Sequence, residues 1–171
     1  MELGKVIEDR RSIRSFNDKV LAKDIIVDIL NYAILAPSAK NRQPWYFVIV
    51  QNKDLKQKIG DSLYKKMGDV SKITSNVIKD CQALVLVYAE IEDMIMDTVS
   101  VGAGIENMIL RATDLGVASL WIGFILNIEE ELSKNLQINK KLISAVAFGY
   151  TDTIPLKRPR KPLEEVSRWY L

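Results

Sequence analysis

The chain carries a cluster of arginine and serine side chains close to its start. It reads Arg10-Arg11-Ser12-Ile13-Arg14-Ser15-Phe16, with three arginines and two serines. Guanidinium groups pair with phosphate oxygens through parallel N–H donors, and hydroxyl groups add further donors. These residue types at this spacing predict an anion site. A solvated basic surface is the alternative that composition alone leaves open.

A second cluster combines amide side chains with two prolines. It reads Ala36-Pro37-Ser38-Ala39-Lys40-Asn41-Arg42-Gln43-Pro44-Trp45. Asn41 and Gln43 offer hydrogen-bond donors and acceptors, and Pro37 and Pro44 restrict the backbone on either side. Such a loop suits a heterocyclic ring with alternating donors and acceptors. An ordinary connection between a helix and a strand is the alternative.

A third cluster lies near the other end of the chain. It reads Pro155-Leu156-Lys157-Arg158-Pro159-Arg160-Lys161-Pro162, with four basic residues in five positions. Prolines stiffen the segment and so reduce the entropy that it loses when its charges close on one phosphate. Loose contact with polyanions is the alternative. Two basic segments and one amide loop together predict a mononucleotide-like cofactor, with both basic segments converging on its phosphate.

The composition agrees with chemistry that a cofactor supplies. The 171 residues include no histidine and one cysteine. These counts exclude a Ser–His or Cys–His nucleophile pair, a histidine metal ligand and an internal disulfide. Cys81 is expected to be a partly buried structural residue. We predict no metal site and no catalytic side chain, and we expect any redox step to belong to a cofactor.

The length and the net charge of the chain exclude further classes of protein. A chain of 171 residues with 48% hydrophobic and 27% charged residues predicts one folded domain, residues 1–171. The 24 basic and 22 acidic residues give a net charge of +2, too balanced for a dedicated nucleic-acid binder. No apolar run approaches the ~20 residues that span a bilayer, and the N-terminus lacks the layout of a signal peptide. We therefore expect a cytoplasmic protein without membrane or nucleic-acid partners.

Periodic apolar residues predict the elements that position these clusters. Helices are expected near 22–35, 53–65, 93–115 and 128–136. Strands are expected at 45–50, 83–88, 118–124 and 143–148, and all four lack polar alternation, which is typical of strands covered on both faces. The segment after residue 150 is expected to be extended and to lie over a surface. This order favours an α+β or mixed α/β domain with one main sheet.

Two glycines, Gly102 and Gly104, interrupt the longest predicted helix. Glycine in a helix interior costs about 1 kcal/mol relative to alanine. Close approach of another backbone or of a flat ligand would offset this cost, and a helix break is the alternative. The Gly102-Ala103-Gly104 run lacks the third glycine of a dinucleotide-binding fingerprint and does not follow a strand, which excludes that site.

In order and spacing, the motifs resemble the nitroreductase family of FMN-dependent oxidoreductases over essentially the whole chain. Besides the three clusters, the matching motifs are Glu106-Asn107-Met108, Leu115-Gly116, Trp121-Ile122-Gly123, Phe148-Gly149-Tyr150 and Leu163-Glu164-Glu165-Val166. The resemblance implies an α+β fold with a central, mostly antiparallel sheet flanked by helices. It also implies an intertwined homodimer with FMN at the subunit interface and the long helix in the dimer core.

The resemblance also assigns cofactor-binding roles. From one subunit, Arg10, Arg11, Ser12 and Arg14 would bind the phosphate and the ribityl and pyrimidine side of the flavin, and Arg158, Arg160 and Lys161 would close on the phosphate. From the other subunit, Pro37, Ser38, Ala39 and Asn41 would line the ring, with Gln43 adding a contact. Ile122 or Gly123 would bring a backbone N–H to flavin N5.

The implied activity is that of an NAD(P)H oxidoreductase. Hydride would pass through flavin N5 in a ping-pong cycle to nitroaromatics, quinones or similar small acceptors. The same fold admits dehalogenation, flavin fragmentation, ring dehydrogenation or a non-enzymatic FMN carrier or sensor. The chain departs from longer family members in two places: residues 67–80 are short and polar where larger members have extra helices, and the tail after Val166 is brief.

Overall fold

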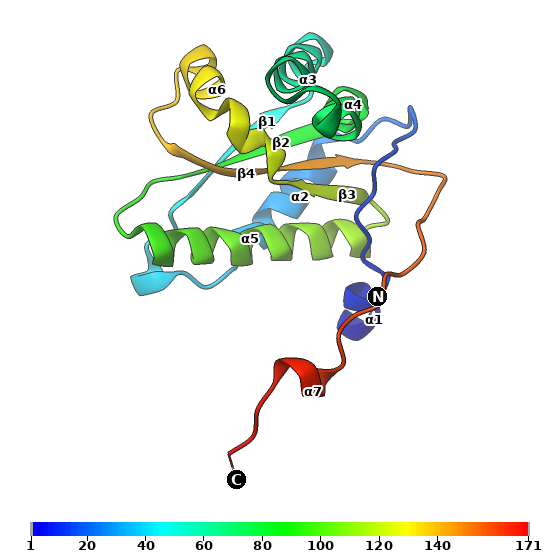
Figure 1. The fold of residues 1–171 in the computed structure, drawn as a ribbon, viewed down its shortest axis with the longest axis vertical. Coiled ribbons are helices and arrows are strands. Elements are labelled where there is room, and N and C mark those ends of the chain that lie inside the picture. Colours follow the sequence, from blue (N-terminus) through cyan, green and yellow to red (C-terminus); the bar gives the residue numbers. More distant parts are fainter. Residues whose placement is uncertain (1, 171) are drawn as a thin grey trace.

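A four-stranded sheet organises the chain in the computed structural model, which describes residues 2–170. The strand order is β1 (Trp45–Val50), β2 (Ala83–Ala89), β4 (Lys141–Gly149) and β3 (Ala118–Ile122), as Figure 1 shows. Every neighbouring pair is antiparallel. The α+β prediction with a mostly antiparallel sheet is confirmed.

Helices cover both faces of this sheet. The α-helices are α1 (Leu3–Asp9), α2 (Lys23–Ala33), α3 (Lys53–Met67), α4 (Lys72–Asp80), α5 (Met94–Asp114), α6 (Glu129–Leu136) and α7 (Leu163–Val166). Three 3-10 turns are η1 (Ala39–Asn41), η2 (Gly68–Ser71) and η3 (Phe124–Ile128). In Figure 1, α3, α4 and α6 lie on one face, and α2 and α5 lie on the other. The four helices expected from periodicity are confirmed within two residues at each end.

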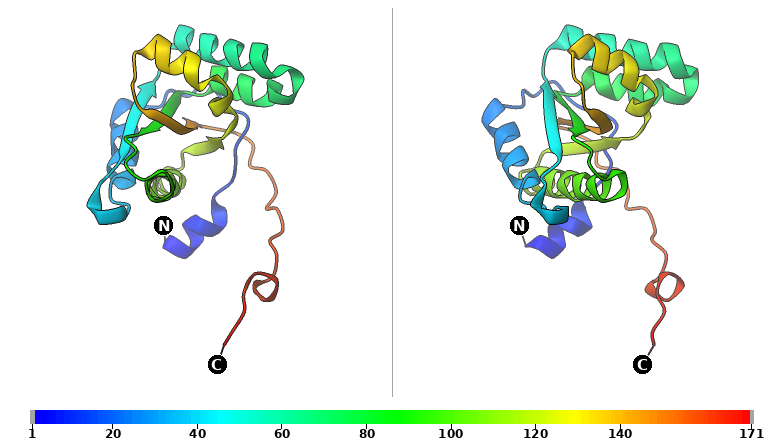
Figure 2. Two further views of the ribbon diagram at one scale, coloured as in Figure 1. Left: turned by 60° about the vertical axis from the view of Figure 1, so that its left-hand side comes forward. Right: turned by 90° about the vertical axis from the view of Figure 1, so that its left-hand side faces the viewer.

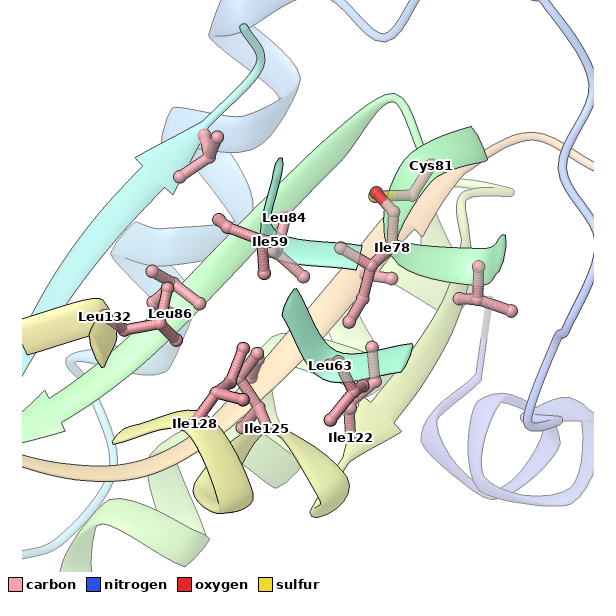
Figure 3. Packing of buried hydrophobic residues seen from close by; sticks show 14 of the residues in the cluster. Ile59, Leu63, Ile78, Cys81, Leu84, Leu86, Ile122, Ile125, Ile128 and Leu132 are labelled. Carbon is pink, nitrogen blue, oxygen red and sulfur yellow. The ribbon is translucent and has the colours of Figure 1, made fainter. Parts of the chain in front are cut away.

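Alternation along β2 divides the core into two layers. Leu84 and Leu86 join a cluster with residues of α3, α4, η3 and α6, which Figure 3 shows from close by. Val85 and Val87 face the opposite way and pack against α2 and α5. Successive side chains of a strand point to opposite faces, so a continuous apolar run predicts burial on both. β2 is buried at every position.

The two edge strands differ from this expectation. β1 and β3 each pair with a single neighbour, and they expose Tyr46, Ile49 and Trp121. The prediction that all four strands are covered on both faces is therefore wrong for β1 and β3. An apolar run does not reveal how many neighbours a strand has. β3 also ends at Ile122, where η3 follows, two residues before the predicted end.

Residues 67–80 form η2 and α4, a helix that the sequence patterns did not predict. Ser71 and Ser75 are buried there together with Val77 and Ile78. A Cβ on Gly60 of α3 would lie 2.8 Å from the Ser75 carbonyl oxygen. The missing side chain lets α3 and α4 pack closely, and small polar residues in the contact hide the apolar periodicity. Cys81, at the end of α4, is fully buried rather than partly buried.

The long helix α5 continues through both glycines without a break. A Cβ on Gly104 would lie 3.3 Å from the Ala33 carbonyl oxygen of α2 and 3.7 Å from the Trp45 ring. The close approach expected from the sequence is thus confirmed at Gly104, and the neighbour belongs to the same chain. A Cβ on Gly102 would have nothing within 4 Å.

The segment after β4 runs away from the sheet and its helices, as both views of Figure 2 show. It is extended apart from α7, as expected, and it leaves the sheet and its helices as it runs toward its end. Leu156 is 93% exposed and Trp169 is 74% exposed. Across residues 2–170, no helix combines the length and apolar character that crossing a membrane requires.

Candidate functional site

Asn17 joins the two ends of the chain that carry the basic clusters. Its backbone N–H donates to the Tyr150 carbonyl oxygen at 2.8 Å, and its side-chain amide donates to the Asp152 carboxylate at 2.9 Å. The Gln82 side chain donates to the Asn17 carbonyl oxygen at 3.2 Å. The segment that follows Arg14 therefore lies beside the segment that leads to Arg158.

The first basic cluster is also fixed to the sheet. Ser12 forms a parallel bridge with Ser119 of β3, and the Ile13 N–H donates to the Ser119 carbonyl oxygen at 2.9 Å. Phe16 lies so close to Gly149 that a Cβ there would be 2.8 Å from the ring. These contacts hold the backbone of residues 12–17 against β3 and β4, while the arginine side chains remain outside the core.

Both basic clusters line one cavity of about 380 Å³, here called the basic cavity. Its lining residues are Ile7, Glu8, Arg10, Arg11, Ser12, Arg14, Pro155, Leu156, Lys157, Arg158 and Arg160. Six of these eleven residues are basic and one is acidic. Lys161 is outside this set, and Lys157 takes part although the resemblance did not assign it.

The donors of the basic cavity fit a phosphate group. Arg11 Nε is buried without a hydrogen-bond partner, while its Nη1 donates to the Glu8 carbonyl oxygen at 2.6 Å. A buried donor without a partner is costly, and an anion would satisfy it. The clustered guanidinium groups repel one another unless an anion neutralises them, and a doubly charged phosphate does so with charge-assisted hydrogen bonds.

The loop of residues 37–44, here called the amide loop, has an unusual backbone. Lys40, Asn41 and Gln43 have φ values of 52°, 54° and 49°, in the left-handed region that non-glycine residues rarely adopt. Within the loop, Ser38 Oγ accepts from the Gln43 N–H at 3.0 Å. Asn41 and Gln43 are exposed. The loop presents two amide side chains outward from a backbone that its surroundings must hold in place.

An ion pair and a serine on α5 hold the amide loop. Arg42 Nε and Nη2 donate to Asp97 Oδ1 at 2.8 and 2.6 Å. Asp97 Oδ2 accepts from the backbone N–H groups of Glu92 and Asp93 at 2.9 and 2.8 Å. These bonds, that of Asp93 first, hold the pKa of the buried Asp97 carboxyl below its usual range against the opposing effect of burial.

Sequence reasoning missed Arg42, Asp97 and Ser100. The Ala39 N–H donates to Ser100 Oγ at 3.2 Å, so Ser100 holds one side of the loop and Asp97 the other. An acidic residue and a serine three positions apart on a helix share one face. The available signal was that this face of α5 also carries Val101, Gly104 and Ile105 and had to be buried.

The third predicted element of the site lies where β3 ends. Ile122 is the last residue of β3 and pairs with Ala145, and Gly123 begins the turn into η3. Ser144 Oγ donates to the Ile122 carbonyl oxygen at 3.0 Å and accepts from Trp121 Nε1 at 2.7 Å. These bonds fix the orientation of the peptide groups next to Gly123, which is itself exposed.

Within one chain, the amide loop and the basic cavity do not meet. In Figure 1 the chain between α2 and β1, which holds the amide loop, passes near the N-terminal end of α5, and α1 lies at the other end. Ile7 and Glu8 of α1 line the basic cavity. The loop is bonded to Asp97 and Ser100, whereas α1 lies beside Leu110 and Asp114, so about 15 Å of α5 separates Ser100 from Leu110. No residue that lines the basic cavity belongs to the amide loop, so one chain does not bring both regions into one cavity. Among residues 2–170, no group of three or more metal-ligating side chains is found.

Known proteins resemble the chain in sequence and in fold. The family model described as Nitroreductase family matches residues 7–150. A relative from Archaeoglobus fulgidus, provisionally named NADH dehydrogenase/NAD(P)H nitroreductase, is 32% identical over 153 residues, 87% of this chain and 85% of its own length. A BluB-like flavoprotein from Clostridium difficile 630 is 26% identical, with a TM-score of 0.86 and 99% of each chain covered.

A nitroreductase with bound FMN from Desulfitobacterium hafniense DCB-2 is 25% identical, with a TM-score of 0.81, and the match covers 99% of this chain and 98% of that one. The family match extends over most of the chain, and it includes the first basic cluster, the amide loop and the end of β3. The chain therefore belongs to the nitroreductase family.

Proposed function

We propose that the protein is an FMN-dependent NAD(P)H oxidoreductase that reduces nitroaromatics, quinones or similar small acceptors. The observation that carries this proposal is the basic cavity, where clusters from both ends of the chain surround a space with the donors that a phosphate needs. The bound FMN of a family structure and the NAD(P)H in the provisional name of the archaeal relative support the choice of cofactor and electron donor.

The basic cavity would bind the phosphate of FMN. Arg10, Arg14, Arg158 and Arg160 supply guanidinium donors, and the Ser12 hydroxyl adds one more. Arg11 contributes the unpartnered Nε. Lys161, outside the lining, would contribute only long-range attraction, and Lys157 takes the closer position. The charge of these groups supplies affinity without any requirement for a proton transfer.

The amide loop of a second copy would line the flavin ring. The absence of any amide-loop residue from the lining of the basic cavity supports a site shared between two chains. Ile95 and Val99 of α5 and Leu156 and Trp169 of the tail are exposed, and a second copy would bury such apolar side chains. A homodimer with two sites therefore accounts for both the divided site and the exposed apolar residues.

When bound, FMN supplies a ring that accepts a hydride from NAD(P)H and passes the electrons to the acceptor. The chain orients this ring. Gly123 follows the last residue pair of β3 and β4, so its N–H lies beyond the strand pairing and is available near N5. The Asn41 and Gln43 amides offer donors to the pyrimidine side of the ring. Burial raises the pKa of the Cys81 thiol to about 12, which leaves no thiolate for a covalent route.

The test begins with the purified full-length chain. We expect a yellow protein with about one FMN per chain, which NADH or NADPH bleaches under anaerobic conditions and which a nitroaromatic or a quinone reoxidises. A colourless protein that fails to bind added FMN would contradict the proposal. Bound FMN that neither nucleotide reduces would favour a carrier or sensor, and reoxidation only by a halogenated phenol would favour dehalogenation.

A further inference from the structure

The amide loop carries three left-handed residues within four positions. Lys40, Asn41 and Gln43 are all non-glycine residues with positive φ. Asparagine tolerates this region better than most residues, but lysine and glutamine have no such preference. Backbone of this kind persists only where the surrounding contacts determine it. The relevant contacts must therefore act on the residues between and beside these three.

Arg42 lies between the left-handed residues Asn41 and Gln43, and its side chain points inward whereas theirs point outward. Its side chain is 16% exposed and reaches the carboxylate of Asp97, which is fully buried. Asn41 and Gln43, on either side, are exposed. Fixing the Arg42 side chain inward thus directs the Asn41 and Gln43 side chains outward. The bond from the Ala39 N–H to Ser100 Oγ fixes the loop on the other side of Lys40.

Bonds other than the one to Arg42 also fix the Asp97 carboxylate. Two backbone N–H groups of the segment before α5 donate to Oδ2, and this leaves Oδ1 for the guanidinium group. Ser100 donates to the Met96 carbonyl oxygen at 2.7 Å, so its hydroxyl oxygen faces the loop with its lone pairs free for Ala39. The first two turns of α5 therefore offer two acceptors in fixed positions.

We propose that Arg42, with Asp97 and Ser100, is a positioning residue that holds the amide loop in the conformation in which it meets the flavin ring. The inference rests on the proposed function, because it needs a ring at the loop. It assigns Arg42 no contact with the ring. Loss of the Arg42–Asp97 pair would release the loop from its left-handed conformation, and the ring would then bind to an ensemble of loop conformations with lower affinity.

The test compares FMN with riboflavin, which has the same ring but no phosphate. The apoprotein is titrated with each flavin, and quenching of flavin fluorescence gives the two dissociation constants. We expect Arg42→Met to weaken both flavins by the same factor, about tenfold, because the loop acts on the ring that they share. Arg42→Lys keeps a positive charge for Asp97, so we expect it to weaken flavin binding less than Arg42→Met does. We expect Ser100→Ala to weaken the binding of both flavins about threefold.

Lys79→Met is the matched control. Lys79 forms an ion pair of 2.5 Å with Asp61 on the other face of the sheet, and its side chain is 21% exposed, similar to Arg42. We expect it to lower the melting temperature by less than Arg42→Met, because Asp61 is 58% exposed and Asp97 is fully buried, and to leave both dissociation constants unchanged. A general loss of stability is thereby separated from loop positioning.

Two results would overturn the inference. One is an Arg42→Met protein that binds riboflavin as the wild type does, and the other is a Lys79→Met protein that loses as much flavin affinity as Arg42→Met. If Arg42→Met fails to fold, Arg42→Lys decides by the same comparison. A wild-type protein that binds neither flavin would instead refute the proposed function, and this is known before any variant is measured.

Discussion

The basic cavity and the amide loop are built in different ways. The basic cavity is assembled from segments at the two ends of the chain, with exposed charges whose backbones are joined through Asn17. The amide loop is a single short segment, held from below by the buried Asp97 and by Ser100. The first region supplies several positive charges, and the second supplies a fixed shape in which Lys40 is the exposed charge.

Because of this difference, we expect salt and substitutions to affect the two regions differently. Exposed charges are screened by salt, whereas a pair with a buried carboxylate is screened much less. Exposed arginines also retain rotamer freedom that binding must remove, and the amide loop has already lost its freedom on folding. Substitutions in the two regions should therefore differ in whether they affect the phosphate or the ring, and in whether they affect stability as well as binding.

The largest expected effect is at Gly104, which supports both ends of the amide loop. Gly104→Leu would drive a side chain into the Ala33 carbonyl oxygen, Ala36 and Trp45, which flank the loop. We expect a loss of about 3 kcal/mol of folding free energy, and hence a melting temperature lower by roughly 6–12 °C. Thermal unfolding, monitored by circular dichroism, measures the change in melting temperature.

Gly102→Ala is the control for that substitution, because a Cβ there has nothing within 4 Å. Alanine is the better helix former, so we expect an unchanged or slightly higher melting temperature. A melting temperature that Gly104→Leu leaves unchanged would show that the close approach of α2 does not require a glycine at that position.

The next largest effect is expected from salt, which should weaken FMN binding and riboflavin binding to different extents. Raising the ionic strength from ~0.05 M to ~0.5 M is expected to weaken FMN binding by about tenfold and riboflavin binding hardly at all, because only the basic cavity acts through exposed charge. The factor by which Arg42→Met weakens binding should stay the same at both ionic strengths. Equal salt dependence of the two flavins would remove the distinction between the regions.

A smaller effect is expected at Asn17. Asn17→Ala removes the side-chain bond to Asp152 but keeps the backbone bond to Tyr150. We expect FMN to bind about three times more weakly, since one exposed hydrogen bond no longer holds the two basic segments together, and riboflavin to bind as before. Titration of the apoprotein measures both. Gln57→Ala, which removes an exposed amide on α3 that bonds Asp61, serves as the control.

Much of this arrangement could be predicted from local sequence. Apolar runs located the four strands, and periodic residues located α2, α3, α5 and α6, because each signal lies within its own element. The edge positions of β1 and β3 depend on strand neighbours, which no single run encodes. The sequence did not predict α4 because the small polar residues Ser71 and Ser75 occupy buried positions, and Ser75 faces Gly60 of α3.

The candidate site, too, could be predicted from local sequence only in part. Residue types alone predicted an anion site at the first basic cluster, because guanidinium groups beside hydroxyls suit phosphate oxygens, and they left a solvated basic surface open. Arg42 and Asp97 are 55 residues apart, and neither stands out in its own segment. Lys157 and Lys161 stand on either side of the same Arg-Pro-Arg segment, so only the path of the chain decides that Lys157 lines the basic cavity.

The most direct test of the account is a double-substitution cycle between the two ends of the chain. Arg10→Ala, Arg158→Ala and the double variant are titrated with FMN and with riboflavin, and Lys65→Ala serves as an exposed basic control. We expect each single substitution to weaken FMN binding by about tenfold or more, the pair to deviate from additivity because both act on one phosphate, and riboflavin affinity to stay constant. Riboflavin affinity that falls in parallel with FMN affinity, or an Arg158→Ala protein that binds FMN as the wild type does, would contradict a shared phosphate site.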